Sequence, residues 1–274
     1  MAMSAFRVRS SCAFSGSLPA MNNLRCSMQS AAPTKKLDLP ELKTGSVRVV
    51  LIRHGAVDLT TPGMTFPKDC FYGGHDVPLS DYGKLEAQAA ANMVEEIPIE
   101  QVYCSPLKRA LYGGERVAEK FGLTPKQDDR FREVNRGRWL GLTKEQVREK
   151  FPGDLEKFQE DPLWCEHGGE TYRQLSERVW SGLNDMVKDA EVNGWKNIAL
   201  VSHMWVTKSI ITKVMGIQPD DQSKWAEMNI PTASVSLLDF NLKQRDNVEV
   251  LAVGLKPPMD TVMEEGKDGK TWGG

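Results

Sequence analysis

The amino-acid sequence predicts an α/β fold, a three-layer α/β/α sandwich with a mostly parallel central sheet. Short runs rich in β-branched residues alternate along the chain with segments whose apolar residues recur every three or four positions. Strands that alternate with helices predict parallel pairing, with helices on both faces of the sheet. The chain has 274 residues, 40% of them apolar and 26% charged, so it can bury a large core.

The first 36 residues differ in composition from the rest of the chain. They contain many serines and several arginines, and no Asp or Glu occurs before Asp38. Such a leader, without a continuous apolar core, is typical of an organellar transit peptide. We predict a transit peptide over 1–36, and the Met-Ala start and the serines favour the chloroplast stroma. The mitochondrion is the alternative destination, and a disordered tail without a targeting role is the simpler interpretation.

The charge pattern and the cysteines exclude several classes of partner. The formal net charge is −2 and no block is rich in Lys and Arg, so nucleic-acid binding has no electrostatic support. No apolar stretch is long enough to span a membrane. The five cysteines form no CxxC pair, and we expect neither a zinc site nor a disulfide framework. The expected partner is a small molecule. We expect the protein to need no cofactor, and the sequence leaves its oligomeric state open.

The first elements after the leader are a strand, a loop and a helix. Residues 46–52 form a β-branched run that predicts a buried strand. The stretch 55–78 contains Gly and Pro and predicts a long loop, and loops of this length are usually functional. Ser80 is placed to cap the next helix. The apolar residues of this helix recur every four positions: Leu85, Ala89, Met93 and Ile97.

A second strand and helix follow in the same order. Residues 101–104 predict a brief strand. Ser105 and Pro106 then have the pattern of an N-cap and a first helical residue. We expect this helix to end near Phe121, because Gly122 follows.

Two further helices are predicted from a capping pattern and from periodicity. Thr143 and Gln146 form a capping-box pattern for a short helix that ends before Pro152. A longer helix has apolar residues at spacings of three and four: Tyr172, Leu175, Val179, Leu183 and Met186.

The last third of the chain completes the predicted sheet. Residues 197–201 form a buried strand, and an apolar helix then runs to Gly216. Two late strands are expected over 234–240 and 248–253. The residues 256–274 contain Gly and Lys and are predicted to be a peripheral tail.

Polar residues follow three of the predicted strands. Arg53 and His54 come after the first strand, Arg109 shortly after the second, and His203 after the strand at 197–201. The carboxyl ends of parallel strands meet at one edge of a sheet, where ligands bind. We therefore expect two histidines and two arginines to converge there.

These residue types suit phosphoryl transfer. A neutral imidazole can attack phosphorus and form a phosphohistidine. Two guanidinium groups can hold the phosphoryl oxygens, and Arg109 is expected in the first helical turn, where the dipole favours an anion. The leaving alkoxide needs a proton from a carboxylic acid. Taken singly, either histidine has a simpler interpretation as a structural residue, and Arg109 as part of a solvated helix face.

The order of the motifs resembles the histidine phosphatase superfamily, also called the phosphoglycerate-mutase-like family. The match covers roughly residues 47–216. It consists of Arg53-His54-Gly55, Tyr72-Gly73, Asp76, Pro78-Leu79-Ser80, Gly83, Gln88-Ala89, Ser105-Pro106-Leu107, Arg109-Ala110, Arg132-Glu133, Gly137, Trp139, Gly141, Gly168-Gly169-Glu170 and Ser202-His203.

The resemblance implies a histidine-phosphatase-like domain over 37–255 and assigns roles within it. His54 would accept the phosphoryl group, and Arg53 and Arg109 would clamp it. His203 would hydrogen-bond the phosphoryl oxygens. Glu133 would protonate the leaving group and then act as the base for water, and no metal would be needed.

The sequence departs from the family pattern on the substrate side. Residues 56–58 are Ala-Val-Asp where the family often has Glu-Thr and then an Asn, and Met204 stands where a Gly usually follows the second histidine. Residues 112–114 are Tyr-Gly-Gly in place of Gln-Thr-Ala, and each glycine costs a helix about 1 kcal/mol relative to Ala. We expect Met204 to reshape the pocket wall and His75 to reach the substrate from the long loop.

Residues 133–139 (EVNRGRW) favour a phosphatase over a mutase, because the mutase branch carries a segment of the Glu-Arg-His-Tyr-Gly type. The predicted function is metal-independent hydrolysis of a small phosphorylated metabolite through a phosphohistidine. One alternative is a phosphoglycerate-type phosphomutase. Another, suggested by Met204, is a catalytically weak family member that binds a phosphate ligand.

Four arginines surround the expected proton donor: Arg130, Arg132, Arg136 and Arg138. They could recognise a second anionic group on the substrate. The simpler interpretation, which we favour, is a solvated charged face that balances acidic residues.

Overall fold

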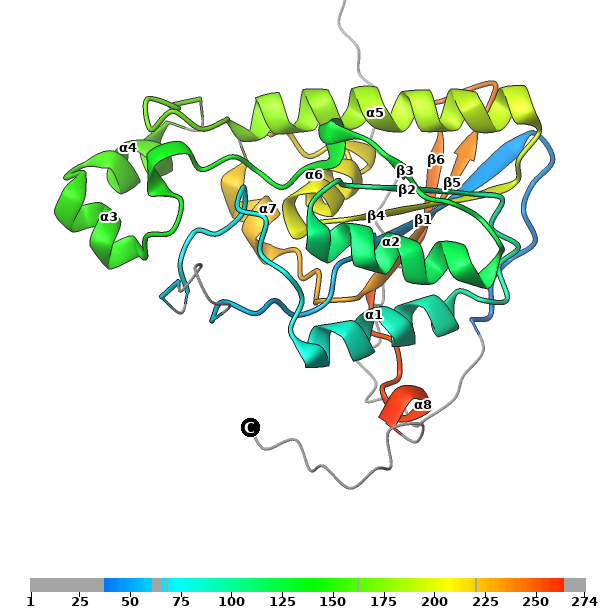
Figure 1. The fold of residues 1–274 in the computed structure, drawn as a ribbon. Helices are drawn as coiled ribbons and strands as arrows, with labels where there is room; N and C mark the ends of the chain where they lie inside the picture. Colours follow the sequence, from blue (N-terminus) through cyan, green and yellow to red (C-terminus); the bar gives the residue numbers. More distant parts are fainter. Residues whose placement is uncertain (1–36, 61–65, 68, 162, 220, 264–274) are drawn as a thin grey trace, which may run out of the picture. The chain divides into compact units, whose positions relative to one another are not determined.

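The computed structural model describes residues 37–60, 66–67, 69–161, 163–219 and 221–263 (Figure 1). The predicted transit peptide at 1–36 lies outside these residues, as does the end of the predicted tail. None of the helices among the described residues combines the length and apolarity that crossing a membrane would require.

A six-stranded sheet forms the centre of the described chain, in the order β3-β2-β4-β1-β5-β6. The first four strands in this order are parallel and β5 runs antiparallel to them. β6 runs antiparallel to β5 and therefore in the same direction as the first four strands. This confirms the predicted mostly parallel sheet. The strands are β1 (Ser46–Arg53), β2 (Gln101–Cys104), β3 (Lys126–Gln127), β4 (Asn197–Ser202), β5 (Val235–Asn241) and β6 (Val248–Leu255).

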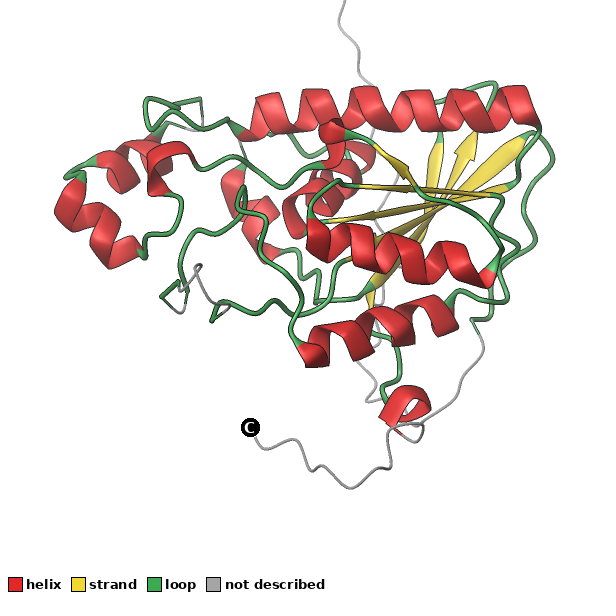
Figure 2. Cartoon of the chain, viewed as in Figure 1, coloured by secondary structure: helices red, strands yellow, loops and turns green. Residues whose placement is uncertain are grey.

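Helices cover both faces of the sheet, which confirms the three-layer prediction (Figures 1 and 2). The helices α1 (Asp81–Met93) and α2 (Lys108–Lys120) lie on one face, and α5 (Tyr172–Asn193) and α6 (Met204–Val214) on the other. The fold follows from strands that are apolar on both sides, because alternate residues of a strand point to opposite faces.

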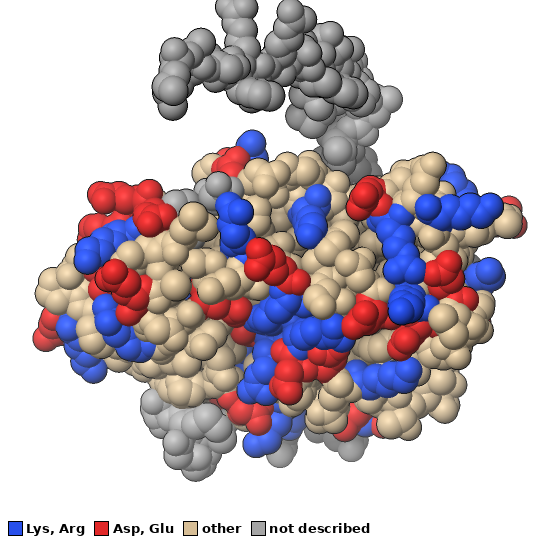
Figure 3. All heavy atoms as spheres, turned by 90° about the horizontal axis from the view of Figure 1, so that it is seen from above, with Lys and Arg blue, Asp and Glu red and all other residues tan. Residues whose placement is uncertain are grey.

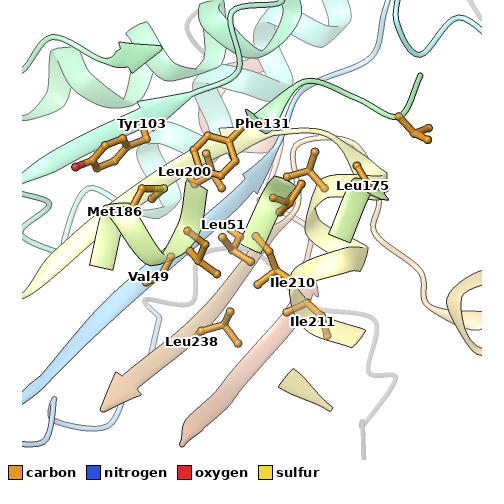
Figure 4. Packing of buried hydrophobic residues seen from close by; sticks show 14 of the residues in the cluster. Val49, Leu51, Tyr103, Phe131, Leu175, Met186, Leu200, Ile210, Ile211 and Leu238 are labelled. Carbon is orange, nitrogen blue, oxygen red and sulfur yellow. The ribbon is translucent and has the colours of Figure 1, made fainter. Parts of the chain in front are cut away.

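The alternation is clearest in β1, the strand between β4 and β5. Val49 and Leu51 pack in the core on the α5 side, together with Leu200 and Ile210 (Figure 4). Val50 and Ile52 pack in the second core, under α1 and α2. Burying each such side chain contributes about 1.5–3 kcal/mol.

The first helix begins as predicted and ends earlier. Ser80 is the N-cap of α1, and its Oγ accepts a hydrogen bond from the Gly83 N–H at 3.0 Å. The helix ends at Met93, so the prediction that Ile97 belongs to it was wrong. Ile97 is buried from a turn instead, because it precedes Pro98 and a residue before proline is disfavoured in the helical region.

The second helix begins later than predicted. Its N-cap is Leu107, so the assignment of Ser105 as N-cap and Pro106 as first helical residue was wrong. The hydroxyl of Ser105 is hydrogen-bonded to His203, which lies in another element. The two glycines of α2 have a packing reason, since a Cβ on Gly114 would lie 3.0 Å from Cβ of Cys104 in β2.

The remaining helices are capped by polar residues or are short. Thr143 and Gln146 form the predicted capping box of α3 (Lys144–Lys150), and α6 follows β4 as predicted. Three short helices were not predicted, because none is long enough to show a periodicity: α4 (Asp154–Glu160), α7 (Gln222–Glu227) and α8 (Asp260–Met263). Figure 1 shows α3 and α4 beyond the same end of the sheet as the loop between β1 and α1.

Candidate active site

The carboxyl ends of β1, β2 and β4 bring the predicted residues together. Arg53, the last residue of β1, pairs with Ser202 of β4. The N–H of His54 donates to the Ser202 carbonyl at 2.9 Å, and the N–H of Ser105 donates to the Val201 carbonyl at 3.0 Å. The register of the sheet therefore fixes the backbone positions of His54, Ser105 and His203.

His54 is buried and its ring is oriented by its own loop. Its Nδ1 lies 2.7 Å from the Gly55 carbonyl, which can only accept, so Nδ1 carries the proton and Nε2 has the lone pair. Nε of Arg109 donates to this Nε2 at 3.3 Å. Burial, together with Arg109 and Arg53, holds the pKa of His54 well below its usual value, so the ring is neutral. These are the properties of an imidazole nucleophile.

Arg109 lies fully buried in the first turn of α2 and connects His54 to the long loop. Its two terminal nitrogens donate to the carbonyls of His75 at 2.7 Å and Gly73 at 2.6 Å. The ring of Tyr72 lies 5.5 Å from the guanidinium carbon. Two of its five N–H groups have no acceptor among the described residues. They can bind oxygens of an anion in front of His54.

Arg53 directly precedes His54 in the sequence. One of its terminal nitrogens donates to the Ile230 carbonyl at 2.5 Å. Its Nε is buried without an acceptor among the described residues. Leaving a charged donor buried and unpaired costs free energy. Such a donor is expected at a binding site, where the ligand supplies the missing acceptor.

His203 lies beside His54, with ring centroids 5.1 Å apart. Its Nε2 is 2.8 Å from Oγ of Ser105, and that oxygen accepts the N–H of Leu107 at 3.3 Å. The Ser105 hydroxyl can donate to Nε2 or accept from it, and in the first case the ring proton stands on Nδ1. Nδ1 is buried and has no hydrogen-bond partner in the part of the chain that the structure describes. Burial and Arg109 lower the pKa of His203 well below its usual value. Sequence reasoning missed Ser105 as a site residue, although the Ser-Pro-Leu motif contained the signal.

Glu133 is buried close to the arginines. Its Oε1 accepts the Val134 N–H at 2.9 Å. Burial raises its pKa, while the Val134 N–H, Arg109, Arg53 and the Trp205 N–H oppose the rise. The net rise favours a carboxyl group that keeps a proton to a higher pH than usual. The loop between β1 and α1 packs directly on the side chain of Glu133, since a Cβ on Gly73 would lie 3.2 Å from Cγ of Glu133.

The two residues predicted on the substrate side have few contacts with this cluster. The backbone carbonyl of His75 accepts from Arg109, while its ring lies 4.8 Å from the ring of Phe66. Met204 is the first residue of α6, next to His203, and is half-buried. Contact of either side chain with a substrate stays a prediction.

Three of the four arginines around Glu133 form ion pairs. Arg130 binds Asp128 and Asp185, Arg132 binds Asp129, and Arg138 binds Asp154. Figure 3 shows one face of the molecule on which acidic and basic side chains intermingle in this way. The interpretation as balanced surface charge is therefore supported for these three. The fourth, Arg136, is buried and has no acidic partner among the described residues.

Sequence reasoning also missed Glu86, a buried carboxylate on α1. Its oxygens accept the Ala56 N–H at 2.6 Å and the Thr232 hydroxyl at 2.8 Å, and Lys256 forms an ion pair with it. It thereby holds the backbone that follows His54. An acidic residue between the apolar positions of a helix was the available signal.

The donor set as a whole is cationic and suits an oxyanion. It consists of two neutral histidines, two arginines and one carboxyl group of raised pKa. Within the described residues, no three His, Cys, Asp or Glu side chains are grouped so as to hold a metal ion. The arrangement offers a nucleophile, a phosphate clamp and a proton donor within one site.

Two curated proteins that are similar in sequence to this chain bear the names of phosphatases. A phosphoserine phosphatase 1 from Hydrogenobacter thermophilus is 29% identical over 203 residues, which are 74% of this chain and 90% of that protein. A glucosyl-3-phosphoglycerate phosphatase from Mycobacterium tuberculosis is 32% identical over 131 residues, which are 48% of this chain and 56% of that protein.

The fold is also found among solved structures. A mycobacterial glucosyl-3-phosphoglycerate phosphatase superposes with a TM-score of 0.65 at 24% identity, over 77% of this chain and 99% of that chain. The model of the histidine phosphatase superfamily (branch 1) matches residues 49–251, which span all the strand ends of the site. The chain therefore belongs to the histidine phosphatase superfamily, branch 1, and is a phosphoric monoester hydrolase of that type.

Proposed function

We propose that the chain hydrolyses a small phosphate monoester through a phosphohistidine on Nε2 of His54. The observation that carries the proposal is the tautomer of His54, because the Gly55 carbonyl fixes the proton on Nδ1 and leaves the lone pair on Nε2. In the described chain that lone pair accepts only the long hydrogen bond from Nε of Arg109, which attack on phosphorus would replace. The low pKa of the ring keeps it unprotonated at neutral pH.

The first step transfers the phosphoryl group to the protein. Nε2 of His54 attacks phosphorus, the bond between phosphorus and the alcohol oxygen breaks, and Glu133 gives its proton to the leaving alkoxide. Arg53, Arg109 and Nδ1–H of His203 stabilise the oxygens of the transferring group.

The second step releases phosphate. Water attacks phosphorus, the carboxylate of Glu133 takes a proton from it, and the N–P bond breaks. Inorganic phosphate leaves, and His54 is neutral again with Glu133 protonated. The two relatives described above, whose names are those of phosphatases, support hydrolysis over isomerisation.

Trapping the phosphoenzyme tests the proposal. Rapid acid-free quenching after mixing with a ³²P-labelled phosphate monoester should leave label on the protein that is stable in alkali and lost in acid. His54→Ala should lose both the label and phosphate release. Full activity of His54→Ala would contradict the mechanism.

A substrate panel separates hydrolysis from the two alternatives. Sugar phosphates, glycerates, nucleotides and phospho-amino acids are assayed for phosphate release. A mutase would isomerise substrate only with a bisphosphorylated primer and release no net phosphate. A ligand-binding family member would bind phosphate at His54 without turnover.

The predicted location is tested separately. A fluorescent protein fused after residue 60 should enter plastids if residues 1–36 are a chloroplast transit peptide. Entry into mitochondria would support the alternative destination, and a diffuse cytosolic signal would contradict targeting.

A further inference from the structure

Arg178 of α5 binds three backbone carbonyls of the segment that contains Glu133. One terminal nitrogen donates to the carbonyls of Arg130 and Arg132, both at 2.8 Å. The other donates to the carbonyl of Glu133 itself at 3.3 Å. Residues 132–136 belong to no helix or strand, so two of these three carbonyls lie outside any regular hydrogen-bond pattern. A single side chain therefore pairs backbone groups that secondary structure leaves open.

Glu170 orients this guanidinium and binds the segment on the far side of Glu133. Its carboxylate accepts from Nε of Arg178 at 2.8 Å and from a terminal nitrogen at 2.5 Å, which makes a bidentate pair. Its Oε1 also accepts the N–H of Asn135 at 2.8 Å, and its own N–H donates to the Asn135 carbonyl at 3.0 Å. The Arg178–Glu170 pair thus holds the backbone both before and after Glu133.

The pair is built on the well-fixed start of α5. Thr171 and Gln174 form a capping box there, and Glu170 directly precedes the cap. The same helix packs closely on the segment, since a Cβ on Gly182 would lie 2.8 Å from Cζ of the buried Phe131. Figure 1 shows the segment, in green, running beside α5. A helix is a more rigid support than a loop, so it can fix the position of a loop residue.

The carboxyl group of Glu133 depends on such support. Its Oε1 accepts the N–H of Val134, the next residue, and this bond moves with the loop itself. A proton donor works only within hydrogen-bond reach of the leaving oxygen. A misplacement of about 1 Å can cost about 10²-fold in rate. The path of the backbone at Glu133 therefore matters for proton transfer.

The five N–H groups of Arg178 are all used inside the protein. Three donate to the carbonyls of the segment and two to Glu170. No donor is left for a substrate oxygen, in contrast to Arg109 and Arg53. Arg178 can affect the reaction only through the residues that it holds.

We propose that Arg178, oriented by Glu170, is a positioning residue that holds the carboxyl group of Glu133 where it protonates the leaving group. The inference rests on the proposed function, because only there is Glu133 the proton donor. Loss of the pair displaces the segment and leaves His54 and the phosphate-binding arginines at the strand ends. It therefore impairs protonation of the leaving group more than attack on phosphorus.

Two substrates with different leaving groups test the inference. One is the alkyl phosphate of the substrate panel that the wild type hydrolyses fastest, and the other is p-nitrophenyl phosphate, whose leaving group needs no proton. The quantity measured is kcat/KM, which covers the steps up to the phosphohistidine. Arg178→Met should lower it about 10²-fold for the alkyl phosphate. The loss for p-nitrophenyl phosphate should be much smaller, whereas general damage to the fold would lower both alike.

Three further variants sharpen the test. Arg178→Lys keeps the charge without the planar fork and should give an intermediate, equally selective loss. The double variant Glu133→Gln/Arg178→Met should lose no more activity on the alkyl phosphate than Glu133→Gln alone, because both changes remove one interaction. The matched control is Asp185→Asn. Asp185, also on α5, binds the same segment only through the side chain of Arg130, so both kcat/KM values should stay within about twofold.

The outcomes separate the inference from the proposed function. Equal losses on both substrates in a folded Arg178→Met, or additive losses in the double variant, overturn the inference. The proposed function then still stands if Glu133→Gln remains selective for the alkyl phosphate. Equal losses in Glu133→Gln overturn the role of Glu133 and the inference with it. If circular dichroism shows that Arg178→Met does not fold, Arg178→Lys decides: a selective loss supports the inference, and an equal loss or none overturns it.

Discussion

The two halves of the site are built in different ways. The phosphate half (Arg53, His54, Arg109 and His203) begins at strand ends, and its side chains are oriented largely by backbone carbonyls such as Gly55 and Ile230. The region around Glu133, which we call the leaving-group half because we propose Glu133 as the proton donor, is formed by loops and helix ends outside the sheet. Met204 begins α6 there, and aromatic rings surround the nearby Arg136. A sheet edge fixes chemistry common to all phosphate esters, whereas the loops determine which ester fits.

The largest effect is expected at Glu133, where the halves meet. Glu133→Gln should lower kcat/KM for alkyl phosphates by up to about 10⁴-fold, because no acid protonates the leaving group. With p-nitrophenyl phosphate, whose leaving group needs no proton, the loss should be much smaller. Equal losses for both substrates would contradict the role as proton donor.

The pH profile gives a second test of the same residue. The pKa of Glu133 is raised, so the required protonated form persists toward neutral pH and is lost as pH rises through that pKa. The low pKa of His54 predicts no loss of nucleophile near pH 6.5. The fall of kcat/KM at high pH should therefore be present in the wild type and absent in Glu133→Gln.

Arg109→Lys tests whether the phosphate half serves all substrates alike. The single nitrogen of lysine cannot replace the three separate guanidinium nitrogens that bind His54, His75 and Gly73, so kcat should fall by about 10²–10³-fold. The fall should be similar for every ester in the panel, measured as phosphate release. A loss confined to some esters would place Arg109 in substrate selection instead.

Met204→Gly should act on the leaving-group half only. Removing this side chain opens the wall beside His203 and should raise kcat/KM for bulky esters relative to small ones by roughly tenfold. The phosphoenzyme should still form, because His203 stays in place. An equal change in kcat/KM for bulky and small esters would show that Met204 does not line the substrate pocket.

The smallest effect concerns stability in the leaving-group half. His167 is buried beside Trp139 and Trp164, its two ring nitrogens have no hydrogen-bond partner among the described residues, and burial lowers its pKa to about 4. Between its ordinary pKa of 6.5 and about 4 the unfolded chain binds this proton and the folded chain does not, so stability falls as pH falls.

His167→Phe should remove this contribution. The slope of the free energy of unfolding against pH should decrease by up to about 1.4 kcal/mol per pH unit in that window. Urea unfolding from pH 7 to pH 4.5 measures it. An unchanged slope would mean that another group binds the protons.

The sequence predicted most of the phosphate half because its position follows from topology. Once parallel strands were expected, His54, Arg109 and His203 had to share one edge of the sheet. The leaving-group half could not be predicted in the same way. Arg136 is distinguished from Arg138 only by three-dimensional packing, since one is surrounded by rings and the other binds Asp154.

Short elements were the other limit of the sequence. The two-residue β3 and the seven-residue α4 are too short to show periodicity. Ser105 matched a helix-cap pattern, yet its hydroxyl is used by His203, which lies 98 positions later in the chain. Contacts over such distances override local preference, as the shift of the start of α2 shows.

The central place of β1 has a consequence for how the protein acquires its activity. β1 pairs only with strands that are synthesised much later, and the contact between Arg48 and Asp239 spans 191 positions. Even the backbone after His54 is held through Lys256, near the end of the described chain. The nucleophile's surroundings therefore cannot form before Asp239 and Lys256 have been synthesised. Folding is expected to be slow, since non-local pairing must pay loop-closure entropy first.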